Sequence, residues 1–181
     1  MAKLRESIGN GILKRKRKKI SRQINVHNFD TAATAAVLFD SRDQGAFEAV
    51  KDFCHFLAGK NISCKSIGYA PQKELPQEML FTKGFTFIQR GNMNWYRKPS
   101  GEAVESLLES KVDLLFDFSD GSAMELRFLV LQSDAAFKVG CFAEDAQDYD
   151  LMIDLGEKRD MVFLAEQFRR YIEMMNPVNG N

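Results

Sequence analysis

Residues 33–39, Ala-Thr-Ala-Ala-Val-Leu-Phe, form a short run without polar and apolar alternation that ends at Asp40. Such a run is typical of a strand covered on both faces, as in a parallel sheet. Apolar side chains then recur at helical intervals until Gly59, at Phe47, Val50, Cys54 and Leu57. A strand, a short turn and a helix therefore follow one another, which is the repeating unit of a parallel α/β fold.

The same unit recurs along the chain. Further strands are expected at residues 62–69, 85–89, 112–118, 136–142 and 149–155. Helices are expected after two capping-box spacings, Ser41-Arg42-Asp43-Gln44 and Ser122-Ala123-Met124-Glu125, after a Ser100 cap, and from Met161 to Met175. Residues 70–83 contain two prolines and predict a loop with at most one helical turn.

This pattern predicts an α/β three-layer sandwich with a mostly parallel sheet of five or six strands. The short first connection favours the second strand beside the first. Flavodoxin-like strand order is the first expectation and Rossmann-like order the second. Residues 29–176 would form this domain, between a basic N-terminal arm at 1–28 and a tail at 177–181.

The distribution of apolar residues and cysteines indicates where in the cell the protein is expected. No apolar run approaches the roughly 18 residues of a membrane span, and the N-terminus lacks the apolar core of a secretory signal. The three cysteines include no Cys-x-x-Cys pair, so neither a disulfide framework nor a zinc knuckle is indicated. We expect a cytoplasmic protein with reduced, mostly buried thiols.

The neutral total charge hides a strong asymmetry. Residues 1–22 hold nine basic side chains and one acid, a net charge of +8, whereas the remaining residues hold 16 basic and 24 acidic side chains, a net charge of −8. Gly9-Asn10-Gly11 is expected to interrupt any helix in this arm. The predicted nucleic-acid contacts are the cations Lys14, Arg15, Lys16, Arg17, Lys18, Lys19 and Arg22.

Other interpretations of the arm stay open. It could dock onto the acidic body of its own fold, remain solvated, or serve as an import signal. It could also lie on anionic lipid, with four apolar side chains dipping into the interface: Leu4, Ile8, Ile12 and Leu13.

A ligand crevice is expected at the carboxyl ends of the strands, where strand order reverses. If the first and fourth strands flank the third, polar and aromatic side chains would rim it: Asp40, Ser41, Asn92, Asn94, Trp95, Asp117, Ser119 and Ser122. The same aspartates and serines could simply cap helices, and Trp95 could close the core over the third strand instead of stacking a base. No metal and no cofactor is assigned.

Catalytic signatures are absent from the sequence. It contains no Gly-rich dinucleotide or Walker motif and no His-Glu-x-x-His, and neither His27 nor His55 has a nucleophile at a diagnostic spacing. Whether the chain is an enzyme stays open, and a non-catalytic role is favoured.

Several strand-like stretches carry a resemblance to a known family. They are Ala36-Val37-Leu38-Phe39-Asp40, Asn94-Trp95, Asp113-Leu114-Leu115, Phe137-Lys138-Val139-Gly140 and Asp150-Leu151-Met152-Ile153. With these, the body from Asn28 to Met175 resembles an uncharacterised bacterial family of single-domain α/β proteins of unknown function. The resemblance implies a bacterial, cytoplasmic α/β protein and brings no active site with it.

The leading hypothesis is a non-catalytic α/β protein that associates with RNA or a ribonucleoprotein through the arm, with Trp95 adding a stacking surface. The alternative is a domain that binds a small molecule or nucleotide in the crevice. Such a domain could also be an enzyme. A peripheral protein on an anionic membrane surface is the third hypothesis.

Overall fold

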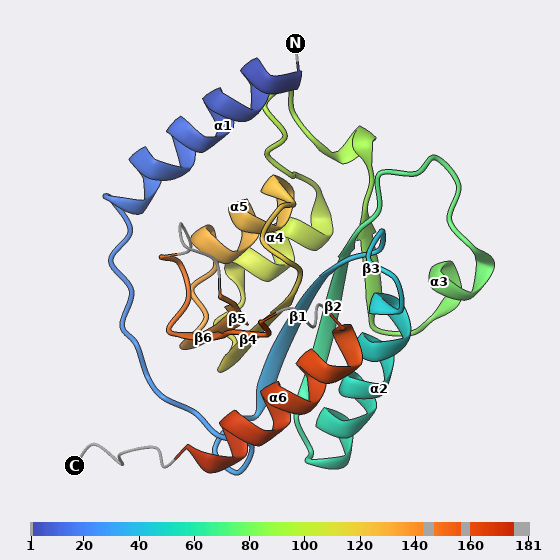
Figure 1. The fold of residues 1–181 in the computed structure, drawn as a ribbon, viewed down its shortest axis with the longest axis vertical. Helices are drawn as coiled ribbons and strands as arrows, with labels where there is room; N and C mark the ends of the chain where they lie inside the picture. The colour runs from blue at the N-terminus through green and yellow to red at the C-terminus, as the bar shows by residue number, and fades with distance from the viewer. Residues whose placement is uncertain (1, 143–146, 157–159, 176–181) are drawn as a thin grey trace.

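The computed structural model describes residues 2–142, 147–156 and 160–175, and within them the predicted α/β architecture is confirmed (Figure 1). The strands are β1 (Thr34–Asp40), β2 (Ser63–Tyr69), β3 (Phe85–Ile88), β4 (Leu114–Phe118), β5 (Phe137–Cys141) and β6 (Leu151–Ile153). The helices are α1 (Ala2–Arg17), α2 (Ala46–Gly59), α3 (Gln77–Phe81), α4 (Glu102–Glu109), α5 (Met124–Gln132) and α6 (Met161–Met174), with a 3-10 turn η1 at Arg90–Asn92.

The strands form one sheet in the order β3-β2-β1-β4-β5-β6, and every neighbouring pair is parallel. This is the Rossmann-like order, so the flavodoxin-like expectation is wrong. Strand β2 does lie beside β1, as expected, but β3 continues outward and pairs with β2 at the edge. Both orders use the same right-handed crossovers, and the side on which the chain leaves β2 depends on packing between distant segments.

Helices cover both faces of the sheet (Figure 1). Helices α2 and α6 cover one face, where Phe39, Phe53, Phe116 and Phe168 belong to one buried cluster. Helices α4 and α5 cover the other, where Leu38 and further aliphatic side chains form a second cluster. Because side chains alternate along a strand, Asp117 on β4 projects toward the α4 and α5 face, as does Leu115 two residues before it.

The basic arm is not a separate pair of short pieces. Helix α1 runs unbroken through Gly9-Asn10-Gly11, contrary to expectation, and Leu13 is 1% exposed in a third buried cluster with α5. A Cβ at Gly9 would collide with Met124, which shows that the glycine permits a close helix approach. Asn10 accepts a hydrogen bond from Arg127 (3.1 Å). Tertiary contacts therefore outweigh the low helix propensity of the two glycines.

Three predicted helix starts are also displaced, by four residues for α2 and by one residue each for α4 and α5. Helices α2, α4 and α5 begin after Gly45, Gly101 and Ala123, none of which makes a side-chain cap. The Glu125 carboxylate of the second expected capping box is used elsewhere, because it accepts hydrogen bonds from Arg97. The single helical turn predicted within residues 70–83 is confirmed as α3.

Candidate functional site

The strand order places the site predicted from the sequence at the junction of β1 and β4. These strands are direct neighbours, with Leu38 opposite Asp117 and Phe39 opposite Phe118. From β1 the chain moves to one side of the sheet and from β4 to the other, so the loops after these strands diverge. A crevice at such a point is where open α/β sheets bind ligands. Asp40 and Asp117 therefore lie together, although not across a third strand as expected.

Asp117 is a fully buried polar side chain at this strand junction. It is 0% exposed, its Oδ2 accepts a hydrogen bond from the Tyr149 hydroxyl (2.6 Å), and its Oδ1 has no partner among the described residues. Burial raises the pKa of Asp117 to about 6, against the opposing effect of the Tyr149 hydrogen bond. The Asp117 carboxyl group can therefore change protonation near neutral pH, which is a property of many functional sites.

Tyr149 is fixed by the glycine opposite its ring. A Cβ at Gly140 would lie 2.7 Å from Cδ1 and 2.8 Å from Cζ of Tyr149. Burial raises the pKa of Tyr149 well above its ordinary value, and the charge of Asp117 raises it further. The phenol therefore stays protonated and can only donate to Asp117 at physiological pH.

The end of β1 and the loop after it contribute two further carboxylates, Asp40 and Asp43. Arg42 donates from Nε to Asp40 Oδ1 (2.9 Å), and its guanidinium lies 5.2 Å from the ring centroid of Tyr69 at the end of β2. Burial raises the pKa of Asp43 to about 6, and the negative charges of Asp40 and Asp120 add to the effect. Asp43 Oδ2 is buried without a partner in the described structure. Asp40 is thus neutralised in place, whereas Asp43 keeps an open acceptor.

A buried ion pair closes the crevice from the side of α5. Arg97 donates to both carboxylate oxygens of Glu125, from Nε (2.7 Å) and Nη2 (2.9 Å), and Glu125 is 0% exposed. Arg97 adopts a φ of 69°, a region that costs a non-glycine residue on the order of 1 kcal/mol. The pair holds the loop between β3 and α4 over the site, and this pairing is one that sequence patterns did not identify.

The serines and asparagines of the predicted crevice have local structural roles. Ser41 hydrogen-bonds Gln72, and the Ser119 hydroxyl accepts from the Gly121 amide (3.3 Å). Ser122 is exposed and donates from its amide to Asp120. The remaining two lie beyond the edge strand β3, where Asn92 bonds the Gln89 amide and Asn94 bonds the amides of Tyr96 and Lys98.

The side chains at these strand ends offer hydrogen-bond acceptors and protonatable carboxyl groups. No three metal-ligating side chains of the described residues are grouped so that they could hold an ion. The carboxylates outnumber the arginines, which favours a ligand that presents hydroxyl or amino groups over a bare anion.

The basic arm contributes a second candidate site. Arg17 forms a bidentate pair with Asp148 (2.6 Å for both bonds), and Arg22 pairs with Asp150 while also donating to the Ala135 carbonyl (2.7 Å). Lys16 donates to Gln132 (2.9 Å). These three side chains therefore dock onto the protein's own domain, as one of the alternative interpretations of the arm predicted.

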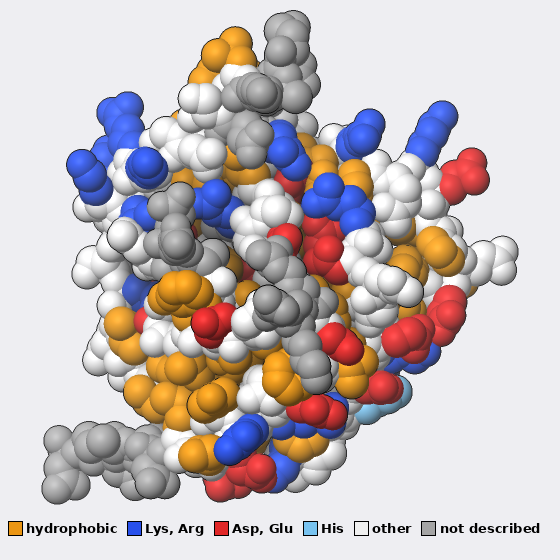
Figure 2. Space-filling view, viewed as in Figure 1, with side chains coloured by type: hydrophobic (Ala, Val, Ile, Leu, Met, Phe, Trp, Pro, Cys, Tyr) orange, Lys and Arg blue, Asp and Glu red, His pale blue; other side chains and the backbone are white. Residues whose placement is uncertain are grey.

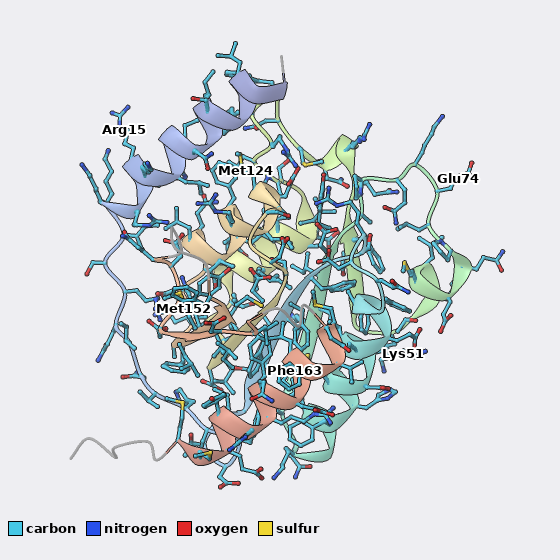
Figure 3. All side chains as sticks on the ribbon, in the orientation of Figure 1. Arg15, Lys51, Glu74, Met124, Met152 and Phe163 are labelled. Carbon is cyan, nitrogen blue, oxygen red and sulfur yellow. The ribbon has the colours of Figure 1, made fainter. Side chains whose placement is uncertain are left out.

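Four other cations of the arm face solvent. Lys14, Arg15, Lys18 and Lys19 are exposed and make no hydrogen bond or ion pair through their side chains with any described residue. We call these four side chains the outer cation cluster. Figure 2 shows basic side chains gathered over the C-terminal half of α1, and Figure 3 shows Arg15 pointing away from the body.

Trp95 lies near the same helix. It is 60% exposed, so it does not close the core, and its ring makes an edge contact with Tyr96 at 5.5 Å. Tyr96 packs on Phe128 and on the cluster that holds Leu13, and its carbonyl oxygen is 3.3 Å from a Cβ position at Gly9. An exposed aromatic ring and the outer cation cluster thus flank one helix.

Comparison with known proteins adds one match. The model of a family described only as a family of unknown function, DUF6913, covers residues 5–175. The match includes most of α1 as well as the α/β body. No curated protein matches the chain.

Proposed function

The chain belongs to DUF6913, a family of unknown function, and we propose that it is a non-catalytic protein of the bacterial cytoplasm that associates with RNA or a ribonucleoprotein. The observation that carries the proposal is the outer cation cluster. It stays free of ion pairs with the described residues although the same segment supplies Arg17 and Arg22 to the domain's own carboxylates.

The docked state of α1 supports phosphate binding. Six consecutive cations from Lys14 to Lys19 repel one another, and a phosphate chain relieves the repulsion. Arg17 and Arg22 anchor the segment, so the outer cations are presented from a fixed support and less conformational entropy is lost on binding. Because Lys16, Arg17 and Arg22 already have partners, four of the seven predicted contacts remain.

Trp95 favours single-stranded RNA as the partner. An exposed aromatic ring can stack an unpaired base, whereas a duplex keeps its bases stacked on each other. The contact between Tyr96 and Gly9 places this ring beside the first half of α1, and the outer cations follow along the same helix and its end. A strand could therefore contact cations and stack on Trp95 together.

Docking of α1 weakens the membrane alternative. Leu13 is buried, and Ile8 and Ile12 are half-buried against the domain, so these side chains are not free to enter a lipid interface. Within the described ranges, no helix combines the length and the apolar character needed to cross a bilayer.

The test is binding of fluorescent single-stranded RNA at several salt concentrations. With four cations engaged, the log–log salt slope should be about −3, so affinity should fall roughly 50-fold between 50 and 200 mM salt. A variant with all four outer cations changed to glutamine should lose this binding. The matched control removes four exposed cations on other surfaces: Lys73, Lys83, Lys111 and Arg170.

Two results with the RNA probe itself would contradict the proposal. One is equal binding by the outer-cluster variant and the control variant, and the other is binding that does not change with salt. Preference for anionic vesicles over RNA, or for duplex DNA over single-stranded RNA, would also reject it in favour of another polyanion. Trp95→Ala should weaken RNA binding without changing the salt slope, because stacking releases no counterions.

A second candidate function rests on a different observation. The unpartnered buried Oδ1 of Asp117, together with the unpartnered Oδ2 of Asp43 in the loop after β1, favours a domain that binds a small molecule or nucleotide. Thermal shift against nucleosides, sugars and polyamines should show selective stabilisation that the outer-cluster variant keeps and Asp117→Asn loses. If the outer-cluster variant lost the stabilisation and Asp117→Asn kept it, the crevice would be excluded as the binding site.

A further inference from the structure

Two thiols meet where helix α2 packs on the sheet. Cys54 lies in α2 and Cys64 in β2, and their sulfur atoms are 3.2 Å apart without being bonded. The Ser66 hydroxyl, also on β2, lies 3.1 Å from Cys54 Sγ. A disulfide bond is about 2.05 Å long, so the sulfurs need to approach by only about 1.2 Å to form one.

The surroundings give the two thiols different properties. Hydrogen bonds from Cys64 and Ser66 lower the pKa of Cys54, although burial opposes them. The hydrogen bond with Cys54 and burial raise the pKa of Cys64. Since the thiolate is the nucleophile, Cys54 is the sulfur that reacts first and Cys64 is the sulfur that follows. Both residues are partly exposed, so a small oxidant can reach them.

We propose that Cys54 and Cys64 form a peroxide-reactive dithiol that closes to a reversible intramolecular disulfide. The Cys54 thiolate attacks one oxygen of a hydroperoxide, and the other oxygen leaves as water or an alcohol, which gives a sulfenic acid. Cys64 then attacks the Cys54 sulfur and expels its hydroxyl group as water. Two thiols lose two electrons and two protons, the peroxide is reduced, and a dithiol reductant reverses the step.

The bridge would tie two elements that are already packed together. It would join the middle of α2 to the start of β2 across a sequence separation of 10 residues. Cys141 lies on β5 at the far side of β1 and β4, so it provides an internal reference thiol in the same chain. The inference does not depend on RNA or ligand binding, because it concerns neither the outer cation cluster nor the crevice.

The test uses the full chain, hydrogen peroxide and peptide mapping under non-reducing conditions. Trypsin should release residues 52–60 and 61–65 as one linked species, two mass units below the sum of the free peptides. This species should vanish with dithiothreitol and should persist in Cys141→Ser. It should form faster than Cys141 is oxidised, because the Cys64 sulfur lies 3.2 Å from Cys54 and can complete the disulfide at once.

Single variants separate the two roles. In Cys64→Ser, a sulfenic-acid trap should label Cys54, whereas in Cys54→Ser the same trap should leave Cys64 unlabelled. As an independent measure without oxidation, phenylarsine oxide should bind the wild type and Cys141→Ser with one arsenic per chain and should not bind either single variant. The proposal fails if Cys54 and Cys64 remain free thiols after Cys141 is oxidised, or if peroxide yields only separate oxidised peptides.

Discussion

Asp117→Asn should make the protein more stable at neutral and alkaline pH, although it removes a buried polar contact of the candidate crevice. The carboxyl group of Asp117 is 0% exposed and keeps one oxygen without a partner in the described structure. At pH 8 it is ionised in the folded state, and burial makes that charge unfavourable relative to the unfolded chain. Asparagine has almost the same shape and no charge to desolvate.

The size of the effect follows from the pKa. Burial raises the pKa of Asp117 from 3.8 to about 6, so the folded state holds the proton more tightly than the unfolded state. Stability from this group is complete below pH 3.8 and is lost as the pH rises through about 6. A shift of about two pKa units corresponds to roughly 3 kcal/mol, of which about 2 kcal/mol falls between pH 4.5 and pH 8.

The assay is urea unfolding of wild type and Asp117→Asn at pH 4.5, 6 and 8. The stability difference between the two proteins should change by about 2 kcal/mol in favour of the variant from the lowest to the highest pH. Other titrating groups cancel in this double difference. Asp52→Asn, at an exposed position of α2, serves as the control and should show no such change. A difference that is constant with pH, or that favours the wild type at pH 8, would refute the reasoning.

Three further predictions concern packing and charge. Gly140→Ala should cost about 1–3 kcal/mol in urea unfolding, because the new methyl group collides with the Tyr149 ring. Gly11→Ala should stabilise α1 by up to about 1 kcal/mol, since no atom lies within 4 Å of its Cβ position, and hydrogen exchange of residues 2–17 should slow; faster exchange would contradict a continuous helix. Arg22→Gln should cost about 3 kcal/mol, because the Asp150 carboxylate is left buried without its charge partner, and an unchanged urea midpoint would show that α1 docking does not need this pair.

The layer architecture could be predicted because it is encoded locally. Apolar runs without polar residues at alternate positions, such as residues 33–39, are followed by segments whose apolar residues have helical spacing. This pattern is compatible with few folds other than a parallel sheet covered by helices on both faces. The outward path to β3 could not be predicted, because it depends on whether Phe85 packs beside β2 or elsewhere, a contact between distant segments. The unbroken α1 was missed for the same reason, since Gly9 lowers helix propensity but allows contact with Met124.

Of the residues around the crevice, sequence patterns could predict only those at the ends of strands. Asp40 and Asp117 could be paired because Asp40 ends one apolar strand and Asp117 lies near the end of another, and the observed order brings those strands together. An acid inside the otherwise apolar run 114–118 already required a buried partner, and Tyr149 supplies it. Nothing local shows that Arg97 reaches Glu125, because their loops converge only after folding.

One loop connects the two proposed sites. Tyr96 packs against α5 and against α1 near Gly9, and the next residue, Arg97, holds the buried carboxylate of Glu125. The backbone of Arg97 is in an unfavourable region, which persists only while its neighbours hold it there. Docking of α1 supports Tyr96 and so contributes to the conformation that places Arg97 over the crevice. Any partner that lifted α1 from α5 would therefore weaken the ion pair at the crevice, whereas a strand bound on the outward face of α1 would leave it intact. Lys14 and Arg15 are exposed on α1, and Lys18 and Lys19 are exposed in the turn after it, so the proposed RNA binding at these cations would leave the crevice assembled.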